Sequence, residues 1–304
     1  MNSTALPPSV VELDGPFAHR FLHVRGLRLH AATAGDPHDP LVVLLHGSFG
    51  GWFDFRHVIE PLARRGFHVA AIDMRGFGMS DKPPVELGQD IRTLTGDISG
   101  TITALGHSEA FIVGSDTGAS VAWSFATEHP EQVSGLVSIS GAHPVDLRRA
   151  IAARPWDFMW FIVRTGLVRL PRALLRVLPG VLTWAFRTYV HRNVSSRMPR
   201  HELNDDLQLR LKAARIGKTS RGFMWNNRQL LAVTPLRWAD STITAPILFL
   251  SSGQRLWRPV IARTHKRAAG RFEATSVPHA KNLPMIEAPA AFVDTLASWL
   301  QRAK

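Results

Sequence analysis

Five short apolar runs recur along the chain, each bounded by turn residues and separated by longer, more polar stretches. Runs rich in Val, Ile, Leu and Phe are typical of strands buried on both faces of a parallel sheet. Apolar residues in some of the stretches between, such as residues 90–106, follow helical spacing, which predicts a layered α/β fold. The predicted strands lie within residues 40–47, 68–76, 110–116, 133–141 and 246–253.

Two departures from this rhythm shape the predicted architecture. In residues 21–32, apolar and polar side chains alternate on either side of Gly26. This pattern predicts an antiparallel hairpin at one edge of the sheet. After residue 144 the alternation stops for about a hundred residues of Arg-rich and Trp-rich helical sequence, broken by Pro171, Pro179 and Pro199. We expect a helical insertion that packs on the sheet, because no low-complexity linker separates it. The predicted organisation is core 1–144, helical cap 145–236 and core 237–304.

Composition narrows the class of protein. A chain of 304 residues with 45% hydrophobic residues can bury a large core, and it has no cysteine for disulfides or thiolate metal sites. No basic flank with an apolar stretch follows the first Met, and no apolar run approaches the roughly 20 residues of a membrane span. We therefore expect a cytoplasmic protein, and the sequence indicates neither a metal nor another cofactor.

Residues 111–120, FIVGSDTGAS, combine a predicted strand end with an acid between two glycines. A turn from strand to helix in which Gly114 and Gly118 flank Asp116 is tight and presents the central side chain to a pocket. The positive end of the following helix favours an anion there. A simpler alternative is that Asp116 only caps this helix.

These residues form part of a longer pattern. Residues 44–83, 113–140, 142–144 and 282–289 occur in an order that resembles the α/β-hydrolase superfamily, in particular its epoxide hydrolase and haloalkane dehalogenase branch. The resemblance covers the core on both sides of the insertion and is weak within it. It implies an α/β-hydrolase fold, with a mostly parallel central sheet flanked by helices and with a helical cap.

The resemblance also implies a chemistry. In these families an aspartate, here Asp116, attacks carbon and forms an ester that a histidine-activated water hydrolyses. The oxyanion donors implied by the resemblance are the amide of Thr117 and one amide from Ser48 or Phe49. Trp52, just after that loop, is expected to line the pocket.

The triad partners implied by the family are missing from their expected places. The histidine position, fixed by Glu287 and Pro289, is occupied by Asn282, whose amide cannot accept a proton near neutral pH. The position expected for the acid is occupied by Arg255 when counted back from Pro259 and by Leu256 when counted on from Gly253.

Other residues do not restore the triad on sequence grounds. No Asp or Glu occurs in residues 241–272, and the alternative acid position after the strand 133–141 reads Ser140. His279 precedes Asn282 by about 10 Å of extended chain, too far for a base that must reach its water within roughly 3 Å. His46 and His143 lie beside strand ends, where we expect them to brace loops.

The cap departs from the family as well. Epoxide hydrolases place two tyrosines there, but Tyr189 is the single tyrosine of the chain, and Asn227 stands where the second is expected. We interpret Tyr189 as a surface or packing residue.

Charge is unevenly distributed. The net charge is +12, and no acid occurs in residues 159–201. This segment is either an ordinary cap whose arginines meet water, a surface for anionic lipid, or an entrance for a long apolar or anionic substrate. No nucleic-acid recognition motif accompanies the charge. Two functions remain open. One is an enzyme that acts on an apolar or lipid-like small molecule, with Asp116 as nucleophile or as general acid/base and with weak or altered hydrolysis because the triad partners are missing; the other is a ligand-binding protein without catalysis.

Overall fold

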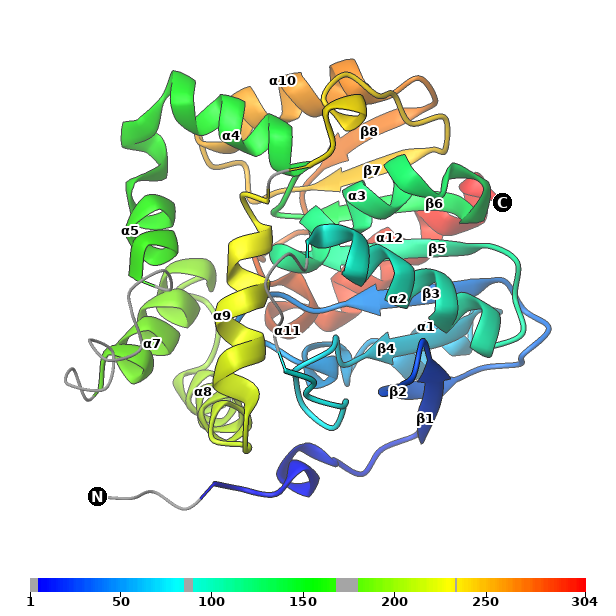
Figure 1. Ribbon diagram of the computed structural model, residues 1–304, viewed down its shortest axis with the longest axis vertical. Helices are drawn as coiled ribbons and strands as arrows, with labels where there is room; N and C mark the ends of the chain where they lie inside the picture. The colour runs from blue at the N-terminus through cyan, green and yellow to red at the C-terminus, as the bar shows by residue number, and fades with distance from the viewer. Residues whose placement is uncertain (1–4, 85–89, 168–179, 233) are drawn as a thin grey trace.

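The structure is a computed structural model that describes residues 5–84, 90–167, 180–232 and 234–304 (Figure 1). Its centre is an eight-stranded sheet in the order β1-β2-β4-β3-β5-β6-β7-β8. Strand β2 pairs antiparallel with β1 and β4, and all the other pairs are parallel. The strands are β1 (Ala18–Val24), β2 (Leu27–Ala34), β3 (Leu41–Leu45), β4 (His68–Ile72), β5 (Ala110–Ser115), β6 (Val133–Ile139), β7 (Ile247–Leu250) and β8 (Phe272–Thr275).

The five predicted strands and the predicted hairpin are confirmed. The β1–β2 hairpin closes through Arg25 and Gly26, whose φ angles of 50° and 76° match the two-residue turn that suits strand twist. Strand β8 was not predicted, because residues 272–275 are only partly buried and include Glu273. An edge strand of this kind lacks the continuous apolar run that marks a buried one.

Helices cover both faces of the sheet, as Figure 1 shows. Strand β3 illustrates the alternation: Val42 and Leu44 join one apolar cluster, and Val43 joins the other. The first cluster includes residues of α1 (Ile59–Ala63), α11 (Pro284–Glu287) and α12 (Pro289–Ala303). The second includes residues of α2 (Ile91–Ala104), α3 (Thr117–Glu128) and α10 (Trp257–Arg267).

Further helices lie between β6 and β7 in the sequence, beyond one end of the sheet (Figure 1). Pro199 immediately precedes one of them, whereas Pro171 and Pro179 lie outside the described residues. We call this helical segment the cap, and its bounds of 145–236 stay a prediction. The helices are α4 (Pro144–Ala153), α5 (Met159–Leu167), α7 (Val181–Asn193), α8 (Arg200–Ala214) and α9 (Thr219–Gln229).

A buried ion pair network joins the cap to the core. Arg210 of α8 is 1% exposed and contacts the carboxylates of Asp206 at 2.6 Å and Asp54 at 2.9 Å. Its guanidinium also donates to the backbone oxygen of Phe49, at 2.8 Å. Because Asp54 and Phe49 belong to the loop after β3, this arginine fixes α8 against that loop.

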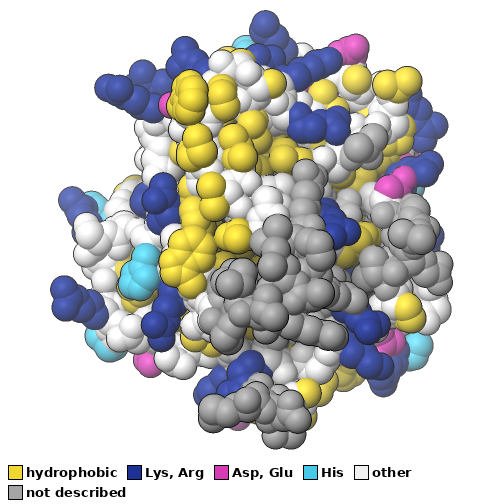
Figure 2. All heavy atoms as spheres, turned by 60° about the vertical axis from the view of Figure 1, so that its left-hand side comes forward, with side chains coloured by type: hydrophobic (Ala, Val, Ile, Leu, Met, Phe, Trp, Pro, Cys, Tyr) yellow, Lys and Arg dark blue, Asp and Glu magenta, His cyan; other side chains and the backbone are white. Residues whose placement is uncertain are grey.

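The outer face of the cap is both apolar and basic. Figure 2 shows a connected strip of hydrophobic side chains bordered by Lys and Arg, with few acids in view. Trp156 is 80% exposed and Trp184 is 49% exposed. In the described part of the chain, no helix is both long enough and apolar enough to cross a membrane. Other exposed large apolar residues near them are Met159, Ile162 and Val163.

The backbone is tightly packed at the turn from β5 to α3, which allows a test of the fold. A Cβ on Gly118 would lie 2.4 Å from the backbone oxygen of Leu45 and 2.6 Å from that of His46. We expect Gly118→Ala to lower the free energy of unfolding by about 3 kcal/mol, since backbone cannot yield cheaply. Urea unfolding followed by tryptophan fluorescence measures this.

Gly166 in α5 provides the matched control, because an added Cβ meets no atom within 4 Å there. Gly166→Ala is expected to leave stability unchanged or to raise it by about 0.5–1 kcal/mol through helix propensity. Equal losses in both variants would contradict the crowding at Gly118.

Candidate active site

Asp116 is the single residue between β5 and α3, and it has a backbone conformation that few residues adopt. Its φ of 52° places it in the left-handed region, and it makes no capping hydrogen bond to α3. A Cβ on Gly114 would lie 2.4 Å from the backbone oxygen of Gly118, so both glycines are required where strand and helix cross. The alternative that Asp116 only caps the helix is therefore wrong. Its side chain is directed at the cap.

The loop after β3 approaches the same carboxylate. The amide of Ser48 donates to Asp116 Oδ2 at 3.1 Å, and the hydroxyls of Ser48 and Thr117 lie 2.9 Å apart. The ring of Phe49 stacks on Tyr189 at 4.5 Å between centroids. The predicted oxyanion residues thus gather around Asp116, with the Ser48 amide already turned toward negative charge.

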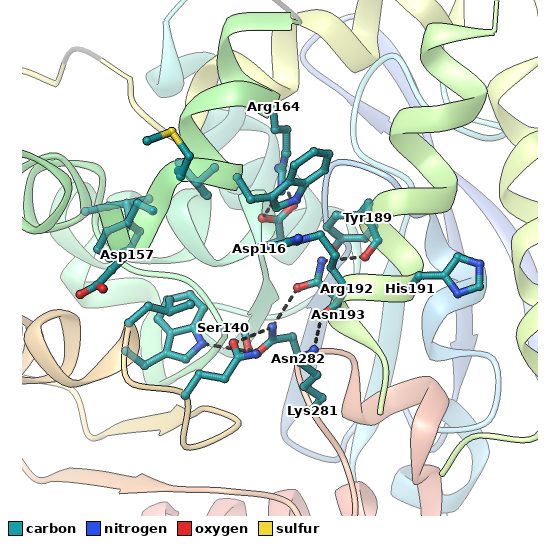
Figure 3. A pocket seen from close by; sticks show the side chains of 18 of the residues that line it. Asp116, Ser140, Asp157, Arg164, Tyr189, His191, Arg192, Asn193, Lys281 and Asn282 are labelled. Atoms are coloured by element: carbon teal, nitrogen blue, oxygen red, sulfur yellow. Dashed lines mark hydrogen bonds and ion pairs between the residues drawn. The ribbon is translucent and has the colours of Figure 1, made fainter. Parts of the chain in front are cut away.

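Arg164, which the sequence did not distinguish from the other arginines of residues 159–201, also contacts the Asp116 carboxylate. Arg164 of α5 donates from Nη1 to Asp116 Oδ1 at 3.1 Å and from Nη2 to Asp116 Oδ2 at 2.8 Å. The two side chains are only 5% and 11% exposed. A bidentate guanidinium–carboxylate pair in such a site is strong and directional. The pair joins the cap directly to the elbow, the tight turn from Gly114 to Gly118 between β5 and α3 (Figure 3).

The surroundings of Arg164 hold its guanidinium in one orientation. Nη2 also donates to the Ser48 hydroxyl at 2.8 Å, and Nε donates to Asn227 Oδ1 at 3.1 Å. The rings of Phe49 and Tyr189 lie 5.0 and 5.4 Å away, within the range of cation–π attraction. Asn227, predicted at a tyrosine position, therefore orients this arginine. The expectation that the arginines of residues 159–201 all meet water is wrong for Arg164.

Asn282 lies on the same cavity with its amide fully engaged. Its Oδ1 accepts from the hydroxyls of Ser140 at 3.0 Å and Ser252 at 2.9 Å. Its Nδ2 donates to Asn193 Oδ1 at 2.9 Å and to Gln254 Oε1 at 3.3 Å. A primary amide has two donors and one acceptor oxygen, so this side chain has little capacity left for a water.

The loop that bears Asn282 is held by Glu287. Its carboxylate accepts from the amides of Lys281 and Leu283 at 3.0 Å and from the amide of Ser195 at 2.6 Å. Burial raises the pKa of Glu287, and these amide donors oppose that effect. The side chain of Asn282 is thereby fixed from both the core and the cap.

Among the described residues, no carboxylate forms a hydrogen bond with the side chain of Asn282. Leu256 lines the cavity, whereas Arg255 is exposed and does not. Ser140 occupies the end of β6, with a φ of 47°, and donates to Asn282. The one cavity carboxylate besides Asp116 among the described residues is Asp157, which points away from both Asp116 and Asn282 in Figure 3.

The candidate histidines are engaged elsewhere. His46 is fully buried, donates from Nδ1 to the Gly47 oxygen at 2.7 Å and accepts from the Met74 amide at 3.2 Å. His143 accepts from the amide of Val145 at 3.3 Å and begins α4. Burial lowers the pKa of His46 and holds that of His143 well below its usual value.

The remaining histidines do not supply a base at Asp116 either. His279 contacts Arg197 outside the cavity. His191 lines the cavity, but its ring points away from Asp116 (Figure 3). In the described part of the chain, no group of three His, Asp or Glu side chains has metal-binding geometry.

Tyr189 and Trp52 are both buried, but only Tyr189 lines the cavity. Of the two alternatives for Tyr189, surface or packing, the structure shows the second: it is 3% exposed, and its hydroxyl lies beside Gly47, next to Asp116. Burial, and then the charge of Asp116, raises the pKa of its hydroxyl. Trp52 does not line the cavity, because its indole N–H donates to the backbone oxygen of Val11 at 2.9 Å. It anchors the N-terminal segment instead.

These residues surround a cavity of about 530 Å³. Aromatic and aliphatic side chains of the cap form one wall, and the polar groups around Asp116 and Asn282 form the other (Figure 3). Such a combination is typical of sites for small organic molecules. The apolar wall includes Leu147, Trp156, Phe158, Met159, Trp160 and Phe161, of which Trp156 and Met159 are also exposed to solvent.

Fold and site together define a class. The strand order, the strained aspartate elbow after β5 and the helices inserted after β6 are those of an α/β-hydrolase. The profile of the α/β hydrolase fold family matches residues 40–241, and the chain belongs to this family.

Individual relatives include proteins named as epoxide hydrolases. The chain is 47% identical over 124 residues to Epoxide hydrolase B of Mycobacterium tuberculosis, covering 40% of this chain and 35% of that relative. It is 36% identical over 159 residues to the AB hydrolase superfamily protein YfhM of Bacillus subtilis, covering 52% and 56%. The chain thus spans about a third to just over half of the length of these relatives.

Solved structures extend the similarity to nearly the whole chain. Epoxide Hydrolase A from Mycobacterium thermoresistibile is similar with a TM-score of 0.72 and 25% identity, covering 94% of this chain and 98% of that one. An epoxide hydrolase mutant from Vigna radiata gives a TM-score of 0.77 at 19% identity, covering 94% and 99%. The second similarity concerns the fold alone.

The pair of Asp116 and Arg164 can be tested by a double-mutant cycle. Arg164→Gln leaves a buried carboxylate without its cation, and we expect the free energy of unfolding to fall by about 3–5 kcal/mol. In the double variant with Asp116→Asn, the loss should be smaller than the sum of the single losses by more than about 1 kcal/mol. Arg187→Gln, on the exposed side of α7, is the control and should change stability by less than about 0.5 kcal/mol. Additive losses would contradict the pairing.

His143 predicts a pH dependence of stability. Its folded pKa is lowered from 6.5, so below that pH the unfolded chain binds a proton that the folded chain does not. Its contribution to stability is therefore lost as the pH falls below about 6.5, by up to about 1.4 kcal/mol per unit. His143→Asn retains a capping side chain and should show a shallower decline in urea unfolding at pH 7 to 5. Superimposable profiles would contradict this.

Proposed function

We propose that this chain holds a small, mainly apolar molecule in the cavity beside Asp116 and does not complete epoxide hydrolysis by the aspartate–histidine route. The observation that carries this proposal is the pairing of Asp116 with Arg164. Both carboxylate oxygens accept hydrogen bonds, and a buried guanidinium neutralises the charge that a nucleophile would use. An aspartate in this state stabilises the structure through an ion pair and does not act as a nucleophile.

The position of Asn282 supports the same conclusion. An ester on Asp116 needs a base to activate water, and an amide cannot accept that proton. Removal of a triad base costs about four to six powers of ten in turnover. Asn282 accepts from Ser140 and Ser252 and donates to Asn193 and Gln254, an arrangement that matches the donors and the acceptor of an amide.

The cavity and the relatives support the kind of ligand. A volume of about 530 Å³ lies within the range of small-molecule sites, and the cap supplies an aromatic wall. Relatives that are named epoxide hydrolases favour an apolar small molecule with one polar atom. That atom would lie near Arg164 and Tyr189.

A second function is favoured by the retained elbow. The Ser48 amide, the Asp116 turn and the Tyr189 hydroxyl are in place for a single alkylation. Asp116 would attack an epoxide carbon, the carbon–oxygen bond would break, and the released oxygen would take the tyrosine proton. Without a base the ester would persist.

Incubation with a panel of epoxides and alkyl halides separates these functions. We expect a bound compound to raise the melting temperature, equivalent to about 2.7 kcal/mol at a hundredfold excess over Kd, with no diol formed. Asp116→Asn should still bind, since the apolar wall is unchanged.

Intact-protein mass provides the decisive comparison. A one-to-one adduct on the wild type that is absent from Asp116→Asn would establish the second function. Continuous product formation by the wild type, lost in Asp116→Asn, would refute the proposal of a binding protein.

A further inference from the structure

A second hollow adjoins the cavity and differs from it in chemistry. It is an open groove of about 940 Å³ between the start of α8, the turn after α7 and the loop before Asn282. The cavity and the groove share two lining residues, His191 and Lys281, and are therefore neighbours. We call it the cationic groove, lined by His191, Val194, Ser195, Ser196, Arg197, Met198, Arg200, Leu203, Asn204, His279, Ala280 and Lys281.

The charges of the cationic groove are uncompensated. Arg197, Arg200 and Lys281 line it, and no acid does. Among the described residues, none of these three side chains forms an ion pair with a carboxylate. The nearby acid Glu287 is occupied by the amides of Ser195, Lys281 and Leu283. Cations that line a hollow without carboxylate partners create a field that attracts an anion.

The loop on one side of the groove is held in position. Lys281 donates from Nζ to the backbone oxygen of Arg192, and its amide is fixed by Glu287. His279, in contact with Arg197, adopts a φ of 63°, a conformation uncommon for residues other than glycine. Such local strain persists where the surroundings determine it and is frequent in ligand clamps.

Neutral donors complete the lining. Ser196 and Asn204 bring a hydroxyl and an amide to the same groove. Arginine guanidinium groups beside hydroxyls and amides suit the several oxygens of a phosphate or carboxylate. On the face of the molecule seen in Figure 2, basic side chains also far outnumber acids.

We propose that the cationic groove binds the anionic head of an amphiphilic ligand whose apolar part occupies the cavity beside Asp116. The ligand class is an alkyl or aryl chain ending in a phosphate or carboxylate. The seating of the apolar part rests on the proposed binding function, whereas recognition of the head rests on the groove alone. Lys281 and His191, at the junction, contact the ligand where the two parts meet.

Decyl phosphate and decanol form the test pair, because they share a chain and differ in the head. Isothermal titration at low salt, below the micelle concentration, should show wild type binding decyl phosphate at least about tenfold more tightly. Arg197→Gln combined with Arg200→Gln should lose most of this preference and keep its affinity for decanol.

The control removes the same charge elsewhere. Arg221→Gln combined with Arg258→Gln, two exposed sites on α9 and α10, should keep the preference. Thermal melting establishes that both double variants are folded. A preference that is equal in all three proteins, or absent from wild type, overturns the groove proposal.

The outcomes separate this inference from the proposed function. Equal binding of decanol and decyl phosphate refutes the groove and leaves the cavity intact. Binding of neither compound refutes both. Sedimentation with phosphatidylglycerol vesicles identifies the source of the anionic head. If wild type sediments with the vesicles and the groove variant does not, the head belongs to a membrane lipid. If wild type does not sediment with them, the head belongs to a free amphiphile.

Discussion

The contact between Asp116 and Arg164 is the constraint on which the site depends. The crossing of β5 and α3 leaves room only for glycines and forces Asp116 into a left-handed conformation with its carboxylate buried. A buried carboxylate requires a partner, and the cap supplies one through α5. The position of the cap and the state of the carboxylate are therefore set by the same pair of hydrogen bonds.

Arginine also seats the cap at a second point. Arg210 on α8 pairs with Asp54 and Asp206 and reaches the backbone of the loop after β3. Desolvation offsets much of the attraction in such pairs, so they add less to stability than to the choice of one docking geometry. With Arg164, they tie two cap helices to the loops that surround the cavity.

The chemistry of the site reflects this arrangement. The carboxylate of Asp116 accepts from the Ser48 amide and from the guanidinium of Arg164, so both of its oxygens are engaged. Across the cavity, Asn282 is held by five side chains and offers no base. Both polar groups lie on the same cavity as the aromatic residues of the cap.

Local pattern by itself determined the strands, the hairpin at Gly26 and the turn around Asp116, because burial on both faces and glycine spacing are short-range signals. The family resemblance, not the local pattern, suggested Ser48 and Thr117 as neighbours of Asp116 and Asn282 at the histidine position. The edge strand β8 and the packing of Trp52 against Val11 were not predicted. Only the tertiary structure distinguished Arg164 from its neighbouring arginines, since whether a side chain meets water or a buried carboxylate depends on how the cap docks.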